Sequence, residues 1–229
     1  MKRIILDLTP PLILRLYSNY RKNPIRFERQ NRKAIKDFNL SFEVVEFAYI
    51  DIEYPFDFKW GWWSRIYEYP LALNILRRCG VNKESKLHNT CWGSQGPHVI
   101  FKNELETISN FVTNSDINRS EVANTSVFDL RSKTPASWLE AFDFVINIST
   151  LEEIDFPHIH IYENLLSMVK PGGYLIATFD LPGLHLEMFE ELFGIKIQIP
   201  STPVSGGNSP YQMAQFSHLK VGYMVVKRA

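Results

Sequence analysis

The run AFDFVINIST, residues 141–150, constrains the fold of this chain more than any other segment. It is rich in β-branched and aromatic residues, which is typical of a strand buried on both faces. A second run of this kind, GGYLIATFDL at residues 172–181, follows after a helix-like segment. Two such strands joined through a helix predict a parallel sheet with helices on both of its faces.

Strand-like and helix-like segments alternate from residue 85 onward. The apolar patterns predict short strands, a helix that ends at the letters KPGG, and two strand-like runs near the C-terminus. The first short strand covers residues 85–90, the second lies within 108–117 and ends at Asp116, and the third lies within 125–130 and ends near Asp129. The helix covers 158–169, and the last two runs cover 193–200 and 218–228. We therefore expect an α/β fold with a mostly parallel twisted sheet and a C-terminal antiparallel strand pair.

Residues 1–84 precede this pattern and differ from it. The segment SFEVVEFAYIDI, residues 41–52, predicts one strand, and a helical pattern then ends at Gly80, a residue suited to a helix C-cap. Three tryptophans lie between these two elements: Trp60, Trp62 and Trp63. We expect two units, a helical and aromatic extension over residues 1–84 and an α/β core over residues 85–229.

Composition narrows the classes of function. The chain has 25 basic and 25 acidic residues, so its net charge is zero and no overall field attracts nucleic acid. Two cysteines are too few for a disulfide framework and indicate a reducing compartment. No segment reaches the ~20 apolar residues that span a bilayer. We expect a cytoplasmic protein that does not bind nucleic acid.

The N-terminal residues combine apolar and basic side chains. Asp7 and the pair Pro10-Pro11 interrupt the apolar run, and no small-residue cleavage site follows, which disfavours a signal peptide. The pattern instead predicts a short basic amphipathic helix that begins near Pro11. This helix either lies weakly on a membrane surface or docks on the protein's own core.

Two acids follow neighbouring strands of the predicted sheet. Ligands of open α/β sheets bind at the carboxyl ends of the strands. Asp116 ends the second core strand roughly twenty residues after the first turn, the spacing at which a carboxylate reaches ribose hydroxyls. Asp129 ends the third strand, where it can accept from an amino group while Phe128 covers an adenine face. Aspartate is also common in turns, but the order of the two acids favours a nucleotide-like cofactor.

The first turn, within the letters KLHNTCWGSQGPHVIF, has the outline of a cofactor loop with unusual residues in it. Gly93 and Gly96 allow a ligand to approach the backbone closely. His88, Thr90 and Trp92 occupy positions at which such loops usually carry an acid or a glycine. The turn either still binds a cofactor or is the remnant of a turn that did.

The segments FDFVINISTLEEID and LLSMVKPGGYLIATFDLPG resemble the second half of class I S-adenosylmethionine-dependent methyltransferases, and the resemblance extends over residues 85–228. It implies a Rossmann-like core that binds S-adenosylmethionine through a glycine-rich first turn and through acids after the second and third strands. The matching positions are Gly93 and Gly96, Asp116 and Asp129. We expect further contacts to the cofactor from residues at or near the strand ends: Thr90, Trp92, Phe128, Ile148 and Ser149.

The chain departs from the family pattern at two places. The first turn lacks the usual acid and the three close glycines, and the turn after the fourth core strand reads LEE, so Glu153 stands where a histidine is common. Trp92 then either lines the pocket for the methionine part of the cofactor or fills a site that no longer binds it. An active enzyme and an inactive cofactor-binding scaffold are both consistent with this sequence.

The segments LTPPLIL and WSRIYEYPLAL resemble N-terminal segments of methyltransferases from surface-polysaccharide (capsule and O-antigen) gene clusters. The resemblance implies methyl transfer to a sugar hydroxyl, with residues 1–84 covering the cofactor and acceptor site. It implies that Arg65 pairs with the cofactor carboxylate and that Trp62 and Trp63 form a lid or a sugar platform. The two tryptophans are equally suited to packing the N-terminal helix on the sheet. The nearest alternative acceptor is a phosphate-containing glycan modifier.

A hydroxyl acceptor needs a general base, and histidine is the usual choice. His158 follows the fourth core strand, and Asp155 and His185 compete with it for this role. His160 lies two residues from His158 on the predicted helix, so these two side chains cannot share a face.

Two further carboxylates, Glu152 and Asp180, have the chemistry to hold a Mg²⁺ ion that binds a sugar diol. No ligand spacing in the sequence is diagnostic of a metal, so we predict no metal centre. The sequence leaves open which small molecule or glycan is the acceptor, and what the oligomeric state is.

Overall fold

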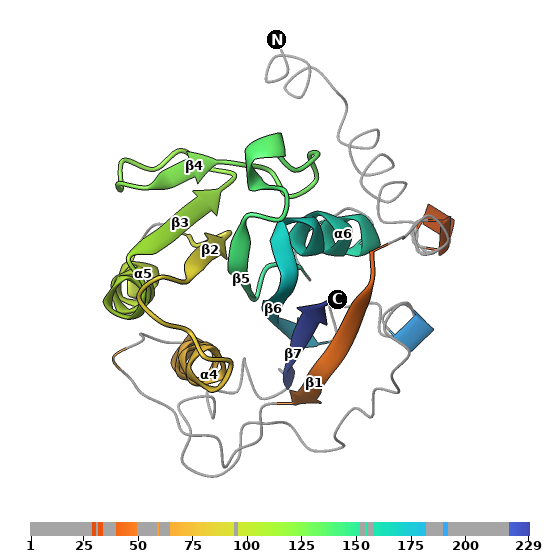
Figure 1. Ribbon diagram of the computed structural model, residues 1–229, viewed down its shortest axis with the longest axis horizontal. Helices are drawn as coiled ribbons and strands as arrows, with labels where there is room; N and C mark the ends of the chain where they lie inside the picture. The colour runs from red at the N-terminus through yellow and green to blue at the C-terminus, as the bar shows by residue number, and fades with distance from the viewer. Residues whose placement is uncertain are drawn as a thin grey trace, which may run out of the picture.

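One mixed sheet organises the protein. The computed structural model describes residues 29–30, 32–33, 40–49, 59, 65–93, 96–151, 154, 158–181, 190–191 and 220–229. Within them, seven strands form a sheet in the order β1-β7-β6-β5-β2-β3-β4 (Figure 1). The elements are β1 Phe42–Tyr49, α4 Arg65–Arg78, β2 Lys86–Thr90, α5 Pro97–Ile108, β3 Phe111–Asp116, β4 Thr125–Val127, the 3-10 helix η2 Ala136–Trp138, β5 Phe142–Ile148, α6 His158–Met168, β6 Val169–Leu181 and β7 Lys220–Arg228.

The strand directions confirm the predicted fold class. Strands β4, β3, β2, β5 and β6 all run parallel to one another, whereas β7 runs antiparallel to β6. This is a Rossmann-like α/β arrangement with an antiparallel strand at the C-terminus. The predicted strand at residues 193–200 lies outside the described residues.

Strand β1 joins the predicted N-terminal extension to the sheet. It pairs antiparallel with β7, from Phe42 opposite Arg228 to Tyr49 opposite Gly222. Glu46 of β1 accepts a hydrogen bond from the Tyr223 hydroxyl of β7. The predicted strand within residues 41–52 is therefore confirmed. The division of the chain at residue 84 stays a prediction, although β1 belongs to the same sheet as the core strands.

Helices cover both faces of the sheet, as predicted. Helices α4 and α5 lie on one face and α6 on the other (Figure 1). Buried apolar side chains of β5, β6 and β7 alternate between two hydrophobic clusters. In β6, Ile176 joins the α4 side while Leu175 and Ala177 join the α6 side. This period of two places an apolar layer on each face of the central strands.

Glycines shape the chain at two places where the sequence predicted that a helix ends. Gly80 has a φ of +83°, and the amides of Gly80 and Val81 donate to the carbonyls of Arg77 and Leu76 at the end of α4. This is a Schellman cap. In KPGG, the strand bulges against β5, and a Cβ on Gly173 would lie 2.6 Å from the Asp143 carbonyl oxygen. The second glycine is therefore needed for close approach of the two strands.

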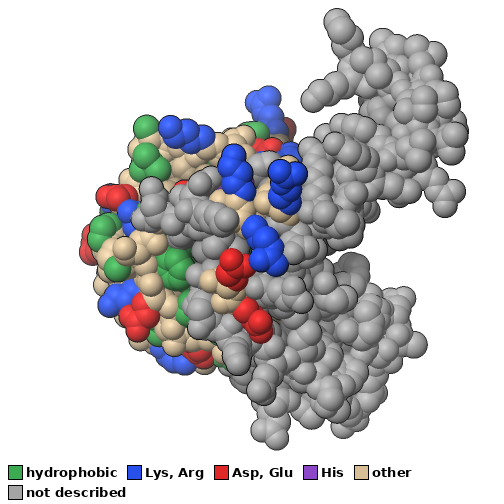
Figure 2. All heavy atoms as spheres, turned by 90° about the vertical axis from the view of Figure 1, so that its right-hand side faces the viewer, with side chains coloured by type: hydrophobic (Ala, Val, Ile, Leu, Met, Phe, Trp, Pro, Cys, Tyr) green, Lys and Arg blue, Asp and Glu red, His purple; other side chains and the backbone are tan. Residues whose placement is uncertain are grey.

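The surface carries charges of both signs. On the face turned to the viewer in Figure 2, the described basic and acidic side chains are interspersed rather than gathered into patches of one sign. None of the helices in the described part of the chain has the length and apolar character to cross a membrane. The predicted amphipathic helix near Pro11 lies outside the described residues.

Candidate functional site

The carboxyl ends of β2 and β5 carry strained backbone. Cys91 follows β2 with a φ of 53°, and Ser149 follows β5 with a φ of 43°. The two strands are neighbours in the sheet. Left-handed conformations of non-glycine residues cost ~1–3 kcal/mol, persist only where the surroundings hold them, and cluster at ligand sites. This edge of the sheet is therefore the candidate site.

Asp116 ties the end of β3 to the first turn. Its side chain is only 7% exposed. One carboxylate oxygen accepts the Gly93 amide at 3.1 Å, and the other accepts the Asn118 amide at 2.8 Å. Gly93 adopts a φ of +78°, which strongly favours glycine. The structure thus brings together two of the residues that the sequence singled out.

Asp129 and Phe128 lie on the next strand end and have local partners. Asp129 forms an ion pair with Arg131 at 2.6 Å, and hydrogen bonds from Arg131 lower the pKa of this carboxyl group. Phe128 is buried and packs edge-to-face on Trp138, with ring centroids 5.1 Å apart. The contacts of Asp129 and Phe128 with an adenine ring stay predictions.

The unusual residues of the first turn have two different environments. Thr90 is buried and its hydroxyl is fully used, because it donates to the Ile146 carbonyl and accepts from the Asn147 amide, both at 2.9 Å. Trp92 is 3% exposed, and its indole N–H has no acceptor among the described residues. Leaving a buried donor unpaired costs ~1–3 kcal/mol, so an acceptor on a ligand would be stabilised there.

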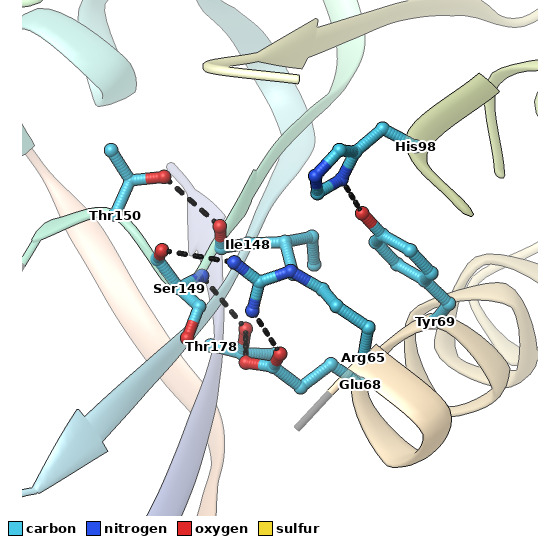
Figure 3. A network of polar contacts seen from close by, with 8 residues as sticks. All are labelled: Arg65, Glu68, Tyr69, His98, Ile148, Ser149, Thr150 and Thr178. Carbon is cyan, nitrogen blue, oxygen red and sulfur yellow. Dashed lines mark hydrogen bonds and ion pairs between the residues drawn. The ribbon is translucent and has the colours of Figure 1, made fainter. Parts of the chain in front are cut away.

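A closed polar network links α4 to the ends of β5 and β6 (Figure 3). Arg65 pairs with Glu68 at 2.5 Å and donates to the Ser149 carbonyl at 3.4 Å. Glu68 has no exposed surface and also accepts the Thr178 hydroxyl at 2.5 Å. The Ser149 amide in turn donates to the Thr178 hydroxyl oxygen at 3.1 Å. The network holds the strained Ser149 and positions the Arg65 cation.

A tyrosine–histidine pair extends this network toward the first turn. The Tyr69 hydroxyl contacts Nδ1 of His98, and the two rings meet edge-to-face. Burial lowers the pKa of His98, and the nearby Arg65 cation adds to this effect. His98 follows Pro97 at the start of α5.

Sequence reasoning found Arg65 but missed Glu68 and Tyr69. The spacing of these three residues, i, i+3 and i+4, places them on one face of a helix. That pattern was a usable signal, but the apolar residues of the same segment dominated its interpretation. Thr178 had no such signal, because a threonine inside a strand is ordinary.

The remaining predicted cofactor contacts lie along the same edge. Gly96 precedes α5 with a φ of +52°, and a Cβ there would meet no atom of the described part of the chain within 4 Å. Ile148 is buried in the cluster under α4, and its carbonyl accepts the Thr150 hydroxyl at 2.9 Å. Burial raises the pKa of the Cys91 thiol to about 12, which agrees with a packing role for this residue.

The candidate bases lie largely outside the described residues. His158 begins α6, but its side chain is not described, and neither Asp155 nor His185 is described at all. His160 is half-exposed, lies 3.5 Å from Glu163 and lines a groove of about 460 Å³ beside α6. The choice among these bases stays a prediction.

The predicted tryptophan platform and metal ligands cannot be placed either. Outside the described set are Trp60, Trp62, Trp63, Glu152, Glu153 and the side chain of Asp180. The described residues contain no cluster of three or more side chains suited to a metal ion.

Comparisons with known proteins show the fold. Neither models of protein families nor the sequences of curated proteins match the chain. Among solved structures, the [4+2]-cyclase SpnF is 12% identical with a TM-score of 0.50, and the match covers 87% of this chain and 92% of SpnF. The chain shares the SpnF fold. Because one fold hosts many chemistries, this likeness leaves the reaction open.

Two more distant solved structures are similar in outline. The MccD protein is 13% identical with a TM-score of 0.49, and the match covers 71% of this chain and 97% of MccD. The N-methyltransferase NodS from Bradyrhizobium japonicum WM9, in complex with S-adenosyl-L-homocysteine, is 13% identical with a TM-score of 0.46. That match covers 69% of this chain and 86% of NodS.

Proposed function

We propose that this chain is an S-adenosylmethionine-dependent methyltransferase that methylates a sugar hydroxyl, in a nucleotide sugar or a surface polysaccharide. The observation that carries the proposal is the bond between Asp116 and the Gly93 amide. It joins the acid after the second core strand to the glycine turn after the first. Ligands of sheets with this topology bind at that edge.

The residues of the edge fit the cofactor. Each Asp116 oxygen accepts one described backbone amide, which leaves acceptor capacity on both oxygens for the two hydroxyls of a ribose. The buried indole N–H of Trp92 has no acceptor among the described residues, which suits a polar cofactor atom better than a plugged site. When bound, S-adenosylmethionine supplies an activated methyl group.

Arg65 is the proposed partner of the cofactor carboxylate. Its guanidinium is 18% exposed and is held at the strand ends by Glu68 and the Ser149 carbonyl. A guanidinium is a planar fork of N–H donors, a geometry that matches a carboxylate. Asp129 is the proposed acceptor for the adenine amino group. It would accept through the carboxylate lone pairs that are not used by Arg131.

The base that takes the proton of the acceptor hydroxyl is proposed to be His158, Asp155 or His185. These residues follow the strands whose carboxyl ends form the candidate site: helix α6 starts at His158, after the end of β5 at Ile148 along the chain. Positioning the acceptor in line with the methyl group supplies much of the rate enhancement in such a transfer.

Isothermal titration calorimetry with S-adenosylmethionine and S-adenosylhomocysteine tests the proposal. We expect Asp116→Ala to weaken binding by ~1–3 kcal/mol, because hydrogen bonds to a charged acceptor are lost. Asp129→Ala is the comparison variant and should cost less, since this partly exposed carboxylate already pairs with Arg131. Thermal unfolding of both variants separates lost binding from lost folding.

Each outcome has a clear consequence. If the wild-type chain binds neither compound at high micromolar concentration, it is not such an enzyme. If Asp116→Ala binds as the wild type does, the ribose acid is placed wrongly. Tight binding without turnover on nucleotide sugars, glycans or phosphate-containing modifiers would instead support the alternative of an inactive scaffold.

A further inference from the structure

Tyr69 presents a hydroxyl to the candidate site from an otherwise apolar environment. Its side chain is 3% exposed, and its ring stacks on Phe101 with centroids 4.2 Å apart and planes 9° from parallel. Burial raises the pKa of Tyr69 well above its usual value, so the hydroxyl keeps its proton. The stacked ring leaves the hydroxyl little freedom to move away from Nδ1 of His98.

The donor and the acceptor can be assigned in each hydrogen bond of the Tyr69 hydroxyl. Arg65 lowers the pKa of Tyr69 by its charge and by a hydrogen bond, against the effect of burial. A guanidinium can only donate, so the Tyr69 oxygen accepts there. The tyrosine proton is then available to Nδ1 of His98. A neutral imidazole has a single N–H, so a hydrogen bond accepted at Nδ1 places the proton on Nε2.

The Nε2 side of His98 lies over the first turn. The position that a Cβ on Gly93 would take is 2.7 Å from Cδ2 and 2.8 Å from Nε2 of this ring. The Gly93 amide is the group that Asp116 holds. In Figure 3 the second ring nitrogen of His98 is directed away from Tyr69, toward the side of the view on which Ile148 and Ser149 lie. The Nε2–H donor is thus at the wall of the candidate site.

We infer that His98, held as the Nε2–H tautomer by Tyr69, donates a hydrogen bond to the carboxylate of the cofactor's amino-acid part and shares this carboxylate with Arg65. The inference rests on the proposed function and adds a second donor to it. A donor beside a fixed cation suits a carboxylate, whereas a general base would need an unprotonated nitrogen facing the acceptor. His98 is therefore assigned to ligand binding, and Tyr69 is a positioning residue.

Two ligands that differ in the amino-acid part test the contact between His98 and the cofactor carboxylate. S-adenosylhomocysteine has the amino-acid part, whereas 5′-methylthioadenosine has the adenosine and the sulfur without it. By calorimetry, we expect His98→Ala to weaken the binding of S-adenosylhomocysteine by about 10- to 100-fold and to change that of 5′-methylthioadenosine by less than about 2-fold. His98→Gln, whose amide can donate, should recover part of the loss.

The tautomer of His98 can be measured directly by NMR. The ¹⁵N chemical shifts of the His98 ring in the ligand-free protein should report a proton on Nε2. In Tyr69→Phe the hydroxyl is removed, and we expect a mixture of tautomers and a smaller loss of S-adenosylhomocysteine affinity than in His98→Ala. Should His98→Ala fail to fold, Tyr69→Phe carries the same comparison between the two ligands.

The outcomes separate this inference from the proposed function. If neither ligand binds the wild type, the proposed function fails and the inference fails with it. If both bind, and His98→Ala weakens both equally, His98 is only structural and the inference alone is overturned. A proton on Nδ1 would also overturn it, since Nε2 would then be an acceptor.

Two glycines provide a matched steric test. Gly93 and Gly96 both have positive φ, so alanine strains the backbone at either position. At Gly93 the new Cβ meets His98, whereas at Gly96 it meets no atom of the described residues within 4 Å. We expect Gly93→Ala to lower the affinity for S-adenosylhomocysteine more than Gly96→Ala does. Equal losses would contradict the placement of His98 over the turn.

Discussion

The two faces of the sheet bury polar side chains near the same carboxyl edge in different ways. Under α4, the network is ionic, because Arg65 pairs with a fully buried Glu68 that also accepts from Thr178. Under α6, the network is uncharged: His88 contacts the Ser115 hydroxyl at 2.9 Å. Burial lowers the pKa of His88 to about 3, so this ring is neutral at physiological pH.

The difference reflects where a charge can be compensated. On the α4 face, a helix outside the sheet supplies both members of the ion pair, so the buried carboxylate has a cation beside it. On the α6 face, the described neighbours of His88 are Ser115, Trp138 and Phe142, and none of them carries a charge. An imidazole there avoids the cost of a buried charge by staying neutral.

Removing one partner of the ionic network should have the largest effect on stability. Glu68→Leu leaves the Arg65 cation without its carboxylate, and we expect the free energy of unfolding to fall by ~3–5 kcal/mol in urea denaturation. The double variant Arg65→Met/Glu68→Leu is the control, and it should lose less because no charge is left uncompensated. If the double variant lost as much as Glu68→Leu, the stranded charge would not be the cause.

The uncharged network predicts an acid-sensitive fold. The unfolded state binds a proton at His88 below its ordinary pKa of ~6.5, whereas the folded state resists protonation until about pH 3. The contribution of His88 to stability is therefore complete above pH 6.5 and falls as the pH is lowered. At pH 4 the loss should be roughly 3 kcal/mol.

The variant His88→Gln is the control for this pH dependence. Glutamine does not titrate, so its stability curve should be flatter than that of the wild type between pH 6.5 and pH 4 in chemical denaturation. Parallel curves for the two proteins would show that His88 does not stay neutral in the folded state.

The smallest of the three effects concerns Thr90 on the α6 face. Thr90→Val removes a hydroxyl that bonds the Ile146 carbonyl and the Asn147 amide, and the free energy of unfolding should fall by ~1–2 kcal/mol. Thr90→Ser keeps the hydroxyl and loses one methyl group, worth about 0.8 kcal/mol. A smaller loss for valine than for serine would mean that packing, rather than hydrogen bonding, matters at this position.

Local patterns in the sequence predicted much of this architecture. The apolar runs of β5 and β6, the cap at Gly80 and the end of α6 just before KPGG all depend on neighbouring residues, and the structure confirms each of them. A turn at KPGG is wrong, because these residues lie within β6, where the pairing with β5 is irregular. The meeting of Asp116 with Gly93 was also predictable, because parallel strands joined through helices bring their carboxyl ends to one edge.

Pairings between distant segments were not predictable in this way. The sequence indicated a strand near residues 41–52, but nothing local selects β7 as its partner. Likewise, nothing in the sequence distinguishes Glu68 and Tyr69 from other residues of an amphipathic helix. Their roles depend on how that helix packs on the sheet. Only through this packing do they meet Thr178 and His98.

By itself, the sequence determined the α/β class, the direction of the core strands and the acid that ends the second core strand, Asp116. These depend on side-chain period, on the conformational demands of glycine and on the fixed handedness of strand connections. The tertiary structure decided which face of the edge is ionic and which histidine faces the first turn. Those choices depend on how α4 packs against the sheet, which is settled by the sum of many weak contacts between distant residues rather than by any local pattern.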